Sequence, residues 1–229
     1  MSVNSARPTT ETLIVPGPAG RLEALLDSPQ NADGASVAVV CHPHPLYGGT
    51  MTNKVVHTLA KAFNELGISA VRFNYRGVGA SEGKYDEGNG ETDDALAVID
   101  WAMQRWPKAR LWLAGFSFGG PVAIRAAVRR NADRLVTVAP AIQKVAVDAS
   151  NLPQIPWLLL QGDKDELVDA EEVQRWVNTL QRPPQLLLLP GVDHFFHGRL
   201  NELRDAVLSW AREIDAKFDG AHAPNSGAQ

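Results

Sequence analysis

The stretch Leu111-Trp-Leu-Ala-Gly-Phe-Ser-Phe-Gly-Gly-Pro121 decides the fold of this chain. Its first four residues form an apolar run as long as one buried strand. The next five, Gly115-Phe-Ser-Phe-Gly119, fit the pattern G-x-S-x-G, and small or apolar residues at 122–128 then indicate a buried helix. The serine of such a turn has a strained backbone, so the positions two residues away must lack side chains, and both are glycine. The stretch therefore predicts strand, tight turn and helix, with the Ser117 hydroxyl at the carboxyl end of the strand.

Composition places the chain among ordinary globular proteins. It has 229 residues, 45% hydrophobic and 21% charged, which suits one large α/β domain or two small ones. The formal net charge of -4 argues against a nucleic-acid surface, and the single cysteine, Cys41, excludes an internal disulfide and suits a reducing compartment. The polar N-terminus lacks a signal-peptide pattern, and no apolar run approaches the ~18 residues of a membrane span. We therefore expect a cytoplasmic protein without nucleic-acid or membrane partners, whose oligomeric state the sequence leaves open.

Short apolar runs and helical periodicity alternate along the chain. Two strands around Pro16-Gly-Pro-Ala-Gly20 predict a hairpin, and the alternation after it is typical of a mostly parallel sheet with helices on both faces. Eight strands are expected, near residues 12–15, 21–26, 37–41, 69–73, 110–114, 134–139, 156–160 and 185–189. Helices are expected near 55–66, 95–102, 122–128, 173–180 and 200–214, with a long loop over 75–90. We expect a flexible N-terminus over 1–10, a single domain over 11–218 and a disordered tail over 219–229.

Two late loops carry the partners that a serine nucleophile needs. A serine hydroxyl requires a base, and the base requires an orienting acid. In an open parallel sheet, all three should lie in loops at the carboxyl ends of strands. The loop after the seventh strand carries Asp163, Asp165 and Asp169, and the loop after the eighth carries His194 and His197. The order serine, aspartate, histidine is that of α/β-hydrolases.

Two further motifs, His42-Pro-His-Pro-Leu-Tyr-Gly-Gly49 and Arg76-Gly-Val-Gly-Ala-Ser-Glu-Gly83, complete a resemblance to a known family. The chain resembles an α/β-hydrolase of the small, lidless, dienelactone-hydrolase-like esterase group, and most closely the bacterial members that carry these motifs, over roughly residues 12–210. The spacing of that family implies Asp165 as the acid and His194 as the base, with His197 the second choice. Asp163 and Asp169 are then expected to cap backbone N–H groups.

The resemblance also implies an oxyanion hole made of two backbone N–H groups. One belongs to Phe118, directly after the serine. The other comes from the loop after the third strand, where the prolines have no N–H and are excluded. The position in the family pattern implies His44 as the first choice and Leu46 as the second. We expect His42 to brace this loop by hydrogen bonding. No metal or organic cofactor is implied. For zinc in particular, His42 and His44 lack a third ligand at zinc-site spacing.

These residues predict a serine hydrolase that cleaves carboxylic esters of small soluble substrates through an acyl-enzyme. Cleavage of thioesters or of peptide and amide bonds by the same residues, and a non-catalytic binding module, are the alternatives. Between the sixth and seventh strands lie 16 residues, 140–155, too few for a cap with its own core. We therefore expect an open cleft bordered by Tyr47, Phe118, Ile142 and Phe195, of which Tyr47, Ile142 and Phe195 are the expected substrate-binding residues.

Overall fold

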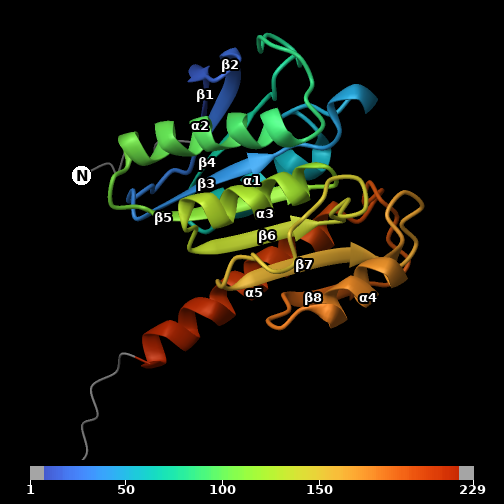
Figure 1. Ribbon diagram of the computed structural model, residues 1–229. Coiled ribbons are helices and arrows are strands. Elements are labelled where there is room, and N and C mark those ends of the chain that lie inside the picture. The colour runs from blue at the N-terminus through green and yellow to red at the C-terminus, as the bar shows by residue number, and fades with distance from the viewer. Residues whose placement is uncertain (1–7, 222–229) are drawn as a thin grey trace, which may run out of the picture.

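A single eight-stranded sheet forms the centre of the protein, whose computed structural model describes residues 8–221 (Figure 1). The strand order is β1-β2-β4-β3-β5-β6-β7-β8; β1–β2 and β2–β4 pair antiparallel, and all other neighbours pair parallel. The strands are β1 (Thr9–Gly17), β2 (Gly20–Ser28), β3 (Ser36–Cys41), β4 (Ser69–Phe73), β5 (Arg110–Phe116), β6 (Arg134–Val138), β7 (Trp157–Gly162) and β8 (Gln185–Leu189). The expected mostly parallel sheet with an antiparallel first hairpin is confirmed.

Helices cover both faces of the sheet, with α2 and α3 on one and α1 and α5 on the other (Figure 1). Alternate side chains of β3 pack into two separate cores, Val37 and Val39 into one and Ala38 and Val40 into the other, and all four are fully buried. Burial on both faces explains the uninterrupted apolar run of this strand. The helices are α1 (Lys54–Glu65), α2 (Asn89–Arg105), α3 (Gly119–Arg130), α4 (Ala170–Thr179) and α5 (Leu200–Ala221), with one 3-10 turn η1 (Pro45–Tyr47).

The ordered fold extends a little beyond both ends of the expected domain. Strand β1 already begins at Thr9, whose neighbour Thr10 donates a hydrogen bond of 2.7 Å from its hydroxyl to Asp27 on β2. At the other end α5 continues through Ala221. The remainder of the two expected terminal segments, residues 1–7 and 222–229, lies outside the described residues.

Helix α2 begins earlier than its apolar periodicity indicated, inside the segment expected to be a loop. Its first turn is held by Glu91, whose carboxylate accepts the backbone N–H of Gly88 at 2.7 Å. Gly90 lies in this turn for a packing reason, since a Cβ there would lie 2.0 Å from a guanidinium nitrogen of Arg76. A glycine that resembled a loop signal in the sequence therefore leaves space for an arginine inside a helix.

Within residues 8–221, no cap covers the carboxyl edge of the sheet. The segment between β6 and β7 consists of turns and contains neither helix nor strand, as its length predicted. The parallel strands β3 to β7 all run toward the same edge of the sheet, on the right in Figure 1, so the loops that follow them meet there. Within the described residues, no helix combines the length and apolarity needed to span a membrane.

Candidate active site

Ser117 occupies the sharp turn between β5 and α3. Its φ of +54° is unusual for a residue with a side chain. The turn is compact because glycines flank it: a Cβ on Gly115 would lie 1.9 Å from the carbonyl oxygen of Gly119, and a Cβ on Gly119 would lie 2.3 Å from that of Cys41. The Ser117 N–H donates to Val138 at 2.9 Å, which anchors the turn to β6. The structure thus confirms the predicted reason for both glycines.

A chain of hydrogen bonds connects Ser117 to residues from two other loops. The Ser117 Oγ lies 3.0 Å from His194 Nε2, and His194 Nδ1 lies 2.8 Å from Asp165 Oδ2. Since Nδ1 faces a carboxylate, that nitrogen carries the proton, and Nε2 is left with a lone pair that accepts the serine hydroxyl. The side chains of His194 and Asp165 are buried, which shields this arrangement from water.

The Asp165 carboxylate is held by further donors besides His194. Its Oδ1 accepts the backbone N–H groups of Leu167 at 2.9 Å and Val168 at 2.7 Å. Its Oδ2 accepts the side-chain amide of Gln161 at 3.0 Å, and Gln161 is fully buried at the end of β7. Gln161 was not predicted from the sequence, although a polar residue near the end of an apolar strand was a usable signal. These contacts fix the direction in which the carboxylate faces.

The other candidate residues do not take part in the hydrogen bonds that connect Ser117, His194 and Asp165. His197 has a side chain 74% exposed and pairs with Asp193, away from Ser117. Asp163 accepts the N–H of Gly191 at 2.6 Å, and Asp169 caps α4 by accepting the N–H of Glu172 at 2.9 Å. Both aspartates therefore cap backbone groups, as expected, and the structure brings together the three residues that the family spacing indicated.

Backbone N–H groups suited to an oxyanion lie on two sides of Ser117. The N–H of Leu46 is occupied, because it donates to His44 Nδ1 at 3.2 Å. The N–H groups of His44 and Phe118 have no hydrogen-bond acceptor within the described residues, and both residues line the same cleft as Ser117. Of the two alternatives from the sequence, this geometry favours His44.

His42 braces the loop that carries His44. Its Nδ1 donates to the carbonyl oxygen of Pro43 at 2.6 Å, and its Nε2 accepts the N–H of Tyr75 at 3.1 Å. Complete burial lowers the pKa of His42 to about 3, although the hydrogen bond to Pro43 opposes the shift. The ring is therefore neutral, as an Nδ1–H donor must be when Nε2 accepts. No cluster of three or more His, Cys, Asp or Glu side chains suited to a metal ion occurs in the described part of the chain.

The neutral state of His42 predicts a loss of stability in mild acid. A histidine in the unfolded chain has a pKa near 6.5, whereas that of folded His42 is about 3, so the unfolded chain binds the extra proton between these values. The contribution of His42 is fully present above pH ~6.5 and is lost as the pH falls toward ~3. We expect denaturant titrations to show that wild type loses about 2 kcal/mol more than His42→Gln between pH ~6.5 and ~5.

The matched control for this titration is His57→Gln, which removes an exposed histidine from α1. Partial burial and then the charge of Arg72 also lower the pKa of His57, but its side chain is exposed, so His57→Gln should keep the wild-type dependence on pH more closely. Equal slopes for wild type and His42→Gln would contradict a neutral, buried His42.

An open cleft of about 440 Å³ lies over Ser117. Three of the four expected bordering residues line it, namely Tyr47, Phe118 and Phe195. Ile142 does not line this cleft, so its prediction as a bordering residue is wrong. Ile142 lines a separate hollow beside α4. The reason is that the N–H of the preceding residue, Ala141, donates to the Ser117 carbonyl oxygen at 3.1 Å, so Ala141 faces the cleft.

Comparison with known proteins identifies the family. Residues 36–154, just over half of the chain, match the family model described as "Serine aminopeptidase, S33". The chain is also 36% identical over 212 residues to an uncharacterized protein of Rickettsia prowazekii, covering 88% of this chain and 89% of that one. The chain belongs to this family of α/β serine hydrolases.

Solved structures place this α/β hydrolase in the lidless group. It is 43% identical to an α/β serine hydrolase homologue from Coxiella burnetii, with a TM-score of 0.81 over 87% of this chain and 96% of that chain. It is 42% identical to a serine hydrolase without lid from Xanthomonas campestris, with a TM-score of 0.83 over 93% and 98%. A dienelactone hydrolase from Anabaena variabilis, 17% identical with a TM-score of 0.76 over 91% and 99%, shares the fold.

Proposed function

We propose that this protein is a serine hydrolase that cleaves carboxylic esters of small soluble substrates through an acyl-enzyme. One observation carries the proposal: the hydrogen-bonded chain from Ser117 through His194 to Asp165, which opens onto a cleft. A structural scaffold has no need for a serine in a strained turn directed at a buried histidine.

The reaction follows from these contacts. Ser117 Oγ attacks the ester carbon, and His194 Nε2 takes the hydroxyl proton while Asp165 stabilises the imidazolium. The N–H groups of Phe118 and His44 stabilise the oxyanion. The tetrahedral intermediate expels the alkoxide, which receives the proton from His194. Water then attacks the acyl-enzyme, again giving its proton to His194, and the carboxylic acid leaves as Ser117 regains its proton.

The charge of the cleft favours an ester over an aminopeptidase substrate. An aminopeptidase must bind a free amino-terminal ammonium group, for which a carboxylate is the natural partner. No Asp or Glu is among the described residues that line the cleft, whereas Lys144 is, and its charge repels an ammonium group. An alkoxide or thiolate also leaves more readily than an amine, so thioester cleavage remains the second candidate.

A fluorophosphonate probe tests the proposal directly. We expect covalent labelling of the wild-type protein at Ser117, located by peptide mapping, and none of Ser117→Ala. Matched ester, thioester and anilide substrates with one acyl group then rank the three bond types, with the ester expected first. Failure of the probe to label, together with no hydrolysis of any of the three, would leave the binding module as the explanation.

The open cleft predicts a preference for short acyl chains. Without a cap, a long acyl chain stays largely in water, and each unburied methylene forgoes about 0.8 kcal/mol of binding. In a series of p-nitrophenyl esters from acetate to palmitate, kcat/KM should therefore be highest for the short esters. Detergent micelles should not activate the enzyme. A maximum at long chains, or a jump in rate on adding micelles, would contradict the absence of a mobile cap.

A further inference from the structure

Lys144 lies on the segment between β6 and β7, close to the serine. The N–H of Ala141 donates to the carbonyl oxygen of Ser117 at 3.1 Å, and the N–H of Lys144 donates to that of Ala141 at 3.0 Å. Ala141 and Val145 are both 3% exposed, so buried residues anchor this turn before and after Lys144. Two successive backbone hydrogen bonds thus link the backbone of Lys144 to that of Ser117, while the exposed side chain of Lys144 lines the cleft.

The positive charge of Lys144 has no partner in the described part of the protein. Among the described residues, no ion pair or side-chain hydrogen bond holds its ammonium group, and no Asp or Glu lines the cleft to balance it. The pKa of His44 on the cleft wall is lowered first by partial burial and then by the charge of Lys144. The cleft therefore combines aromatic walls with one uncompensated positive charge.

Such a cleft concentrates substrates of opposite charge. A single positive charge beside low-dielectric walls raises the local concentration of anions. A lysine is a compact point charge on a flexible stem, so it accepts a carboxylate or a phosphate without demanding one geometry.

We propose that the cleft selects esters that carry an anionic group, a carboxylate or a phosphate, and that Lys144 binds this group. The inference rests on the proposed ester hydrolysis and narrows its substrates. The anionic group lies on a part of the ester that does not react, since the reacting carbonyl belongs beside Ser117. Because Lys144 is exposed, water screens the contact, and the effect is one of moderate selectivity.

The test compares anionic esters with neutral reference esters. On the alcohol side, p-carboxyphenyl acetate and p-acetoxyphenyl phosphate are each compared with neutral p-carbamoylphenyl acetate, which separates carboxylate from phosphate. On the acyl side, p-nitrophenyl monoadipate is compared with neutral p-nitrophenyl adipamate. For each pair, the ratio of kcat/KM for the anionic to the neutral ester is measured in wild type, Lys144→Gln and Lys144→Glu. Intrinsic reactivity cancels when one ratio is compared among these three proteins.

For at least one pair of esters, we expect the ratio to fall about fivefold in Lys144→Gln. A fivefold change is about the largest effect that an exposed ion pair has on binding. The ratio should fall about 25-fold in Lys144→Glu, where an attraction becomes a repulsion of similar size. The change should appear in KM, since a charge on a non-reacting group is bound equally in the ground and transition states. Added salt at about 0.5 M should shrink the wild-type ratio toward that of Lys144→Gln.

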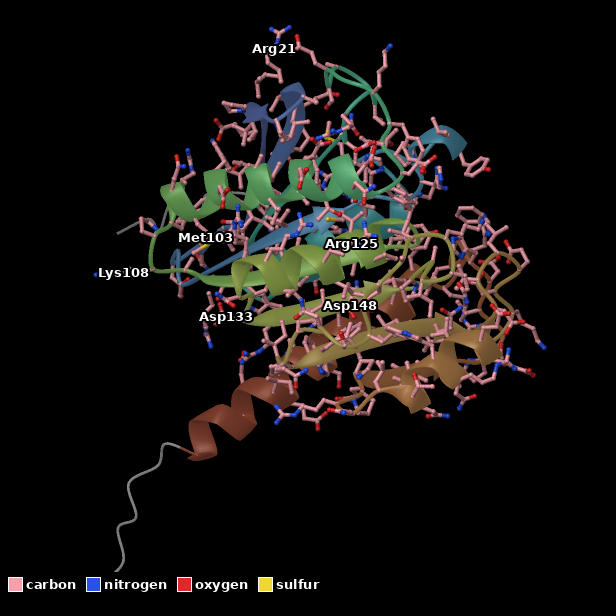
Figure 2. All side chains as sticks on the ribbon, viewed as in Figure 1. Arg21, Met103, Lys108, Arg125, Asp133 and Asp148 are labelled. Atoms are coloured by element: carbon pink, nitrogen blue, oxygen red, sulfur yellow. The ribbon has the colours of Figure 1, made fainter. Side chains whose placement is uncertain are left out.

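The control is Lys108→Gln, which removes another exposed lysine. Figure 2 shows Lys108 in the turn before β5, at the opposite edge of the sheet from the cleft. For every pair of esters, the ratio of kcat/KM measured in Lys108→Gln should equal that of wild type. Equal ratios in wild type and both Lys144 variants would overturn the inference, provided that Ser117→Ala is inactive on the same esters. If Ser117→Ala hydrolyses them as wild type does, the proposed function itself fails.

Discussion

Ser117→Ala is expected to lower turnover roughly 10³- to 10⁶-fold while leaving the fold intact, the range seen when a serine nucleophile is removed. Alanine keeps the Cβ and removes only the oxygen, so the strain of the positive φ and the packing of the flanking glycines are unchanged. The hydrogen bond to His194 is lost, and no atom remains to form the acyl-enzyme. The measurement is kcat on a short p-nitrophenyl ester, with circular dichroism to confirm folding.

A second serine provides the matched control. Ser81 is buried and, like Ser117, lies within a motif that contains glycines, but its hydroxyl donates to the Asn74 carbonyl oxygen and accepts the N–H of Glu23. Ser81→Ala should therefore cost about 1 kcal/mol of stability through its lost hydrogen bonds and keep its activity. Activity of Ser117→Ala above about a tenth of wild type lies far outside the expected range and would contradict its role as nucleophile.

Removing the base or the acid should be almost as damaging. His194→Ala eliminates the group that accepts the serine proton. Asp165→Asn replaces an acceptor facing His194 Nδ1, so the ring proton moves to Nε2 and the serine hydroxyl loses its acceptor. For the equivalent change in a serine protease the loss in kcat is about 10⁴-fold, and we expect a similar value here. Steady-state kinetics on the same ester measures both variants.

Neighbouring residues of the same type serve as controls for this pair. His197→Ala and Asp163→Asn should retain most of the activity, because both side chains bond to groups away from Ser117. Loss of activity in His197→Ala with retention in His194→Ala would mean that the histidine has been assigned wrongly.

Local patterns in the sequence were sufficient for most of the fold. The eight apolar runs correspond to the eight strands. A central strand such as β3 is apolar throughout because it is buried on both faces, whereas the edge strands β1 and β8 are largely exposed. The turn at Ser117 was also predictable, since the contacts that exclude a Cβ at Gly115 involve residues only four or five positions away. Local signals of this kind need no knowledge of distant segments.

Contacts between distant segments were beyond such patterns. Gly90 in the first turn of α2 leaves space for Arg76, fourteen residues earlier in the sequence, whereas the glycine alone indicated a loop. Ile142 was misplaced because its direction follows from a backbone hydrogen bond between Ala141 and Ser117, which the sequence does not reveal.

The sequence by itself determined the nucleophile, its position at a strand end and the order of its partners, because these depend on one motif and on strand succession. Only the tertiary structure decided which histidine meets the serine and which aspartate meets that histidine. Asp163 and Asp165 are two residues apart, and their side chains differ only in whether they face Gly191 or His194. The family spacing indicated the right pair, but the physical reason is the approach of β5, β7 and β8 in one sheet, which brings loops 29 and 77 residues apart to within hydrogen-bond distance.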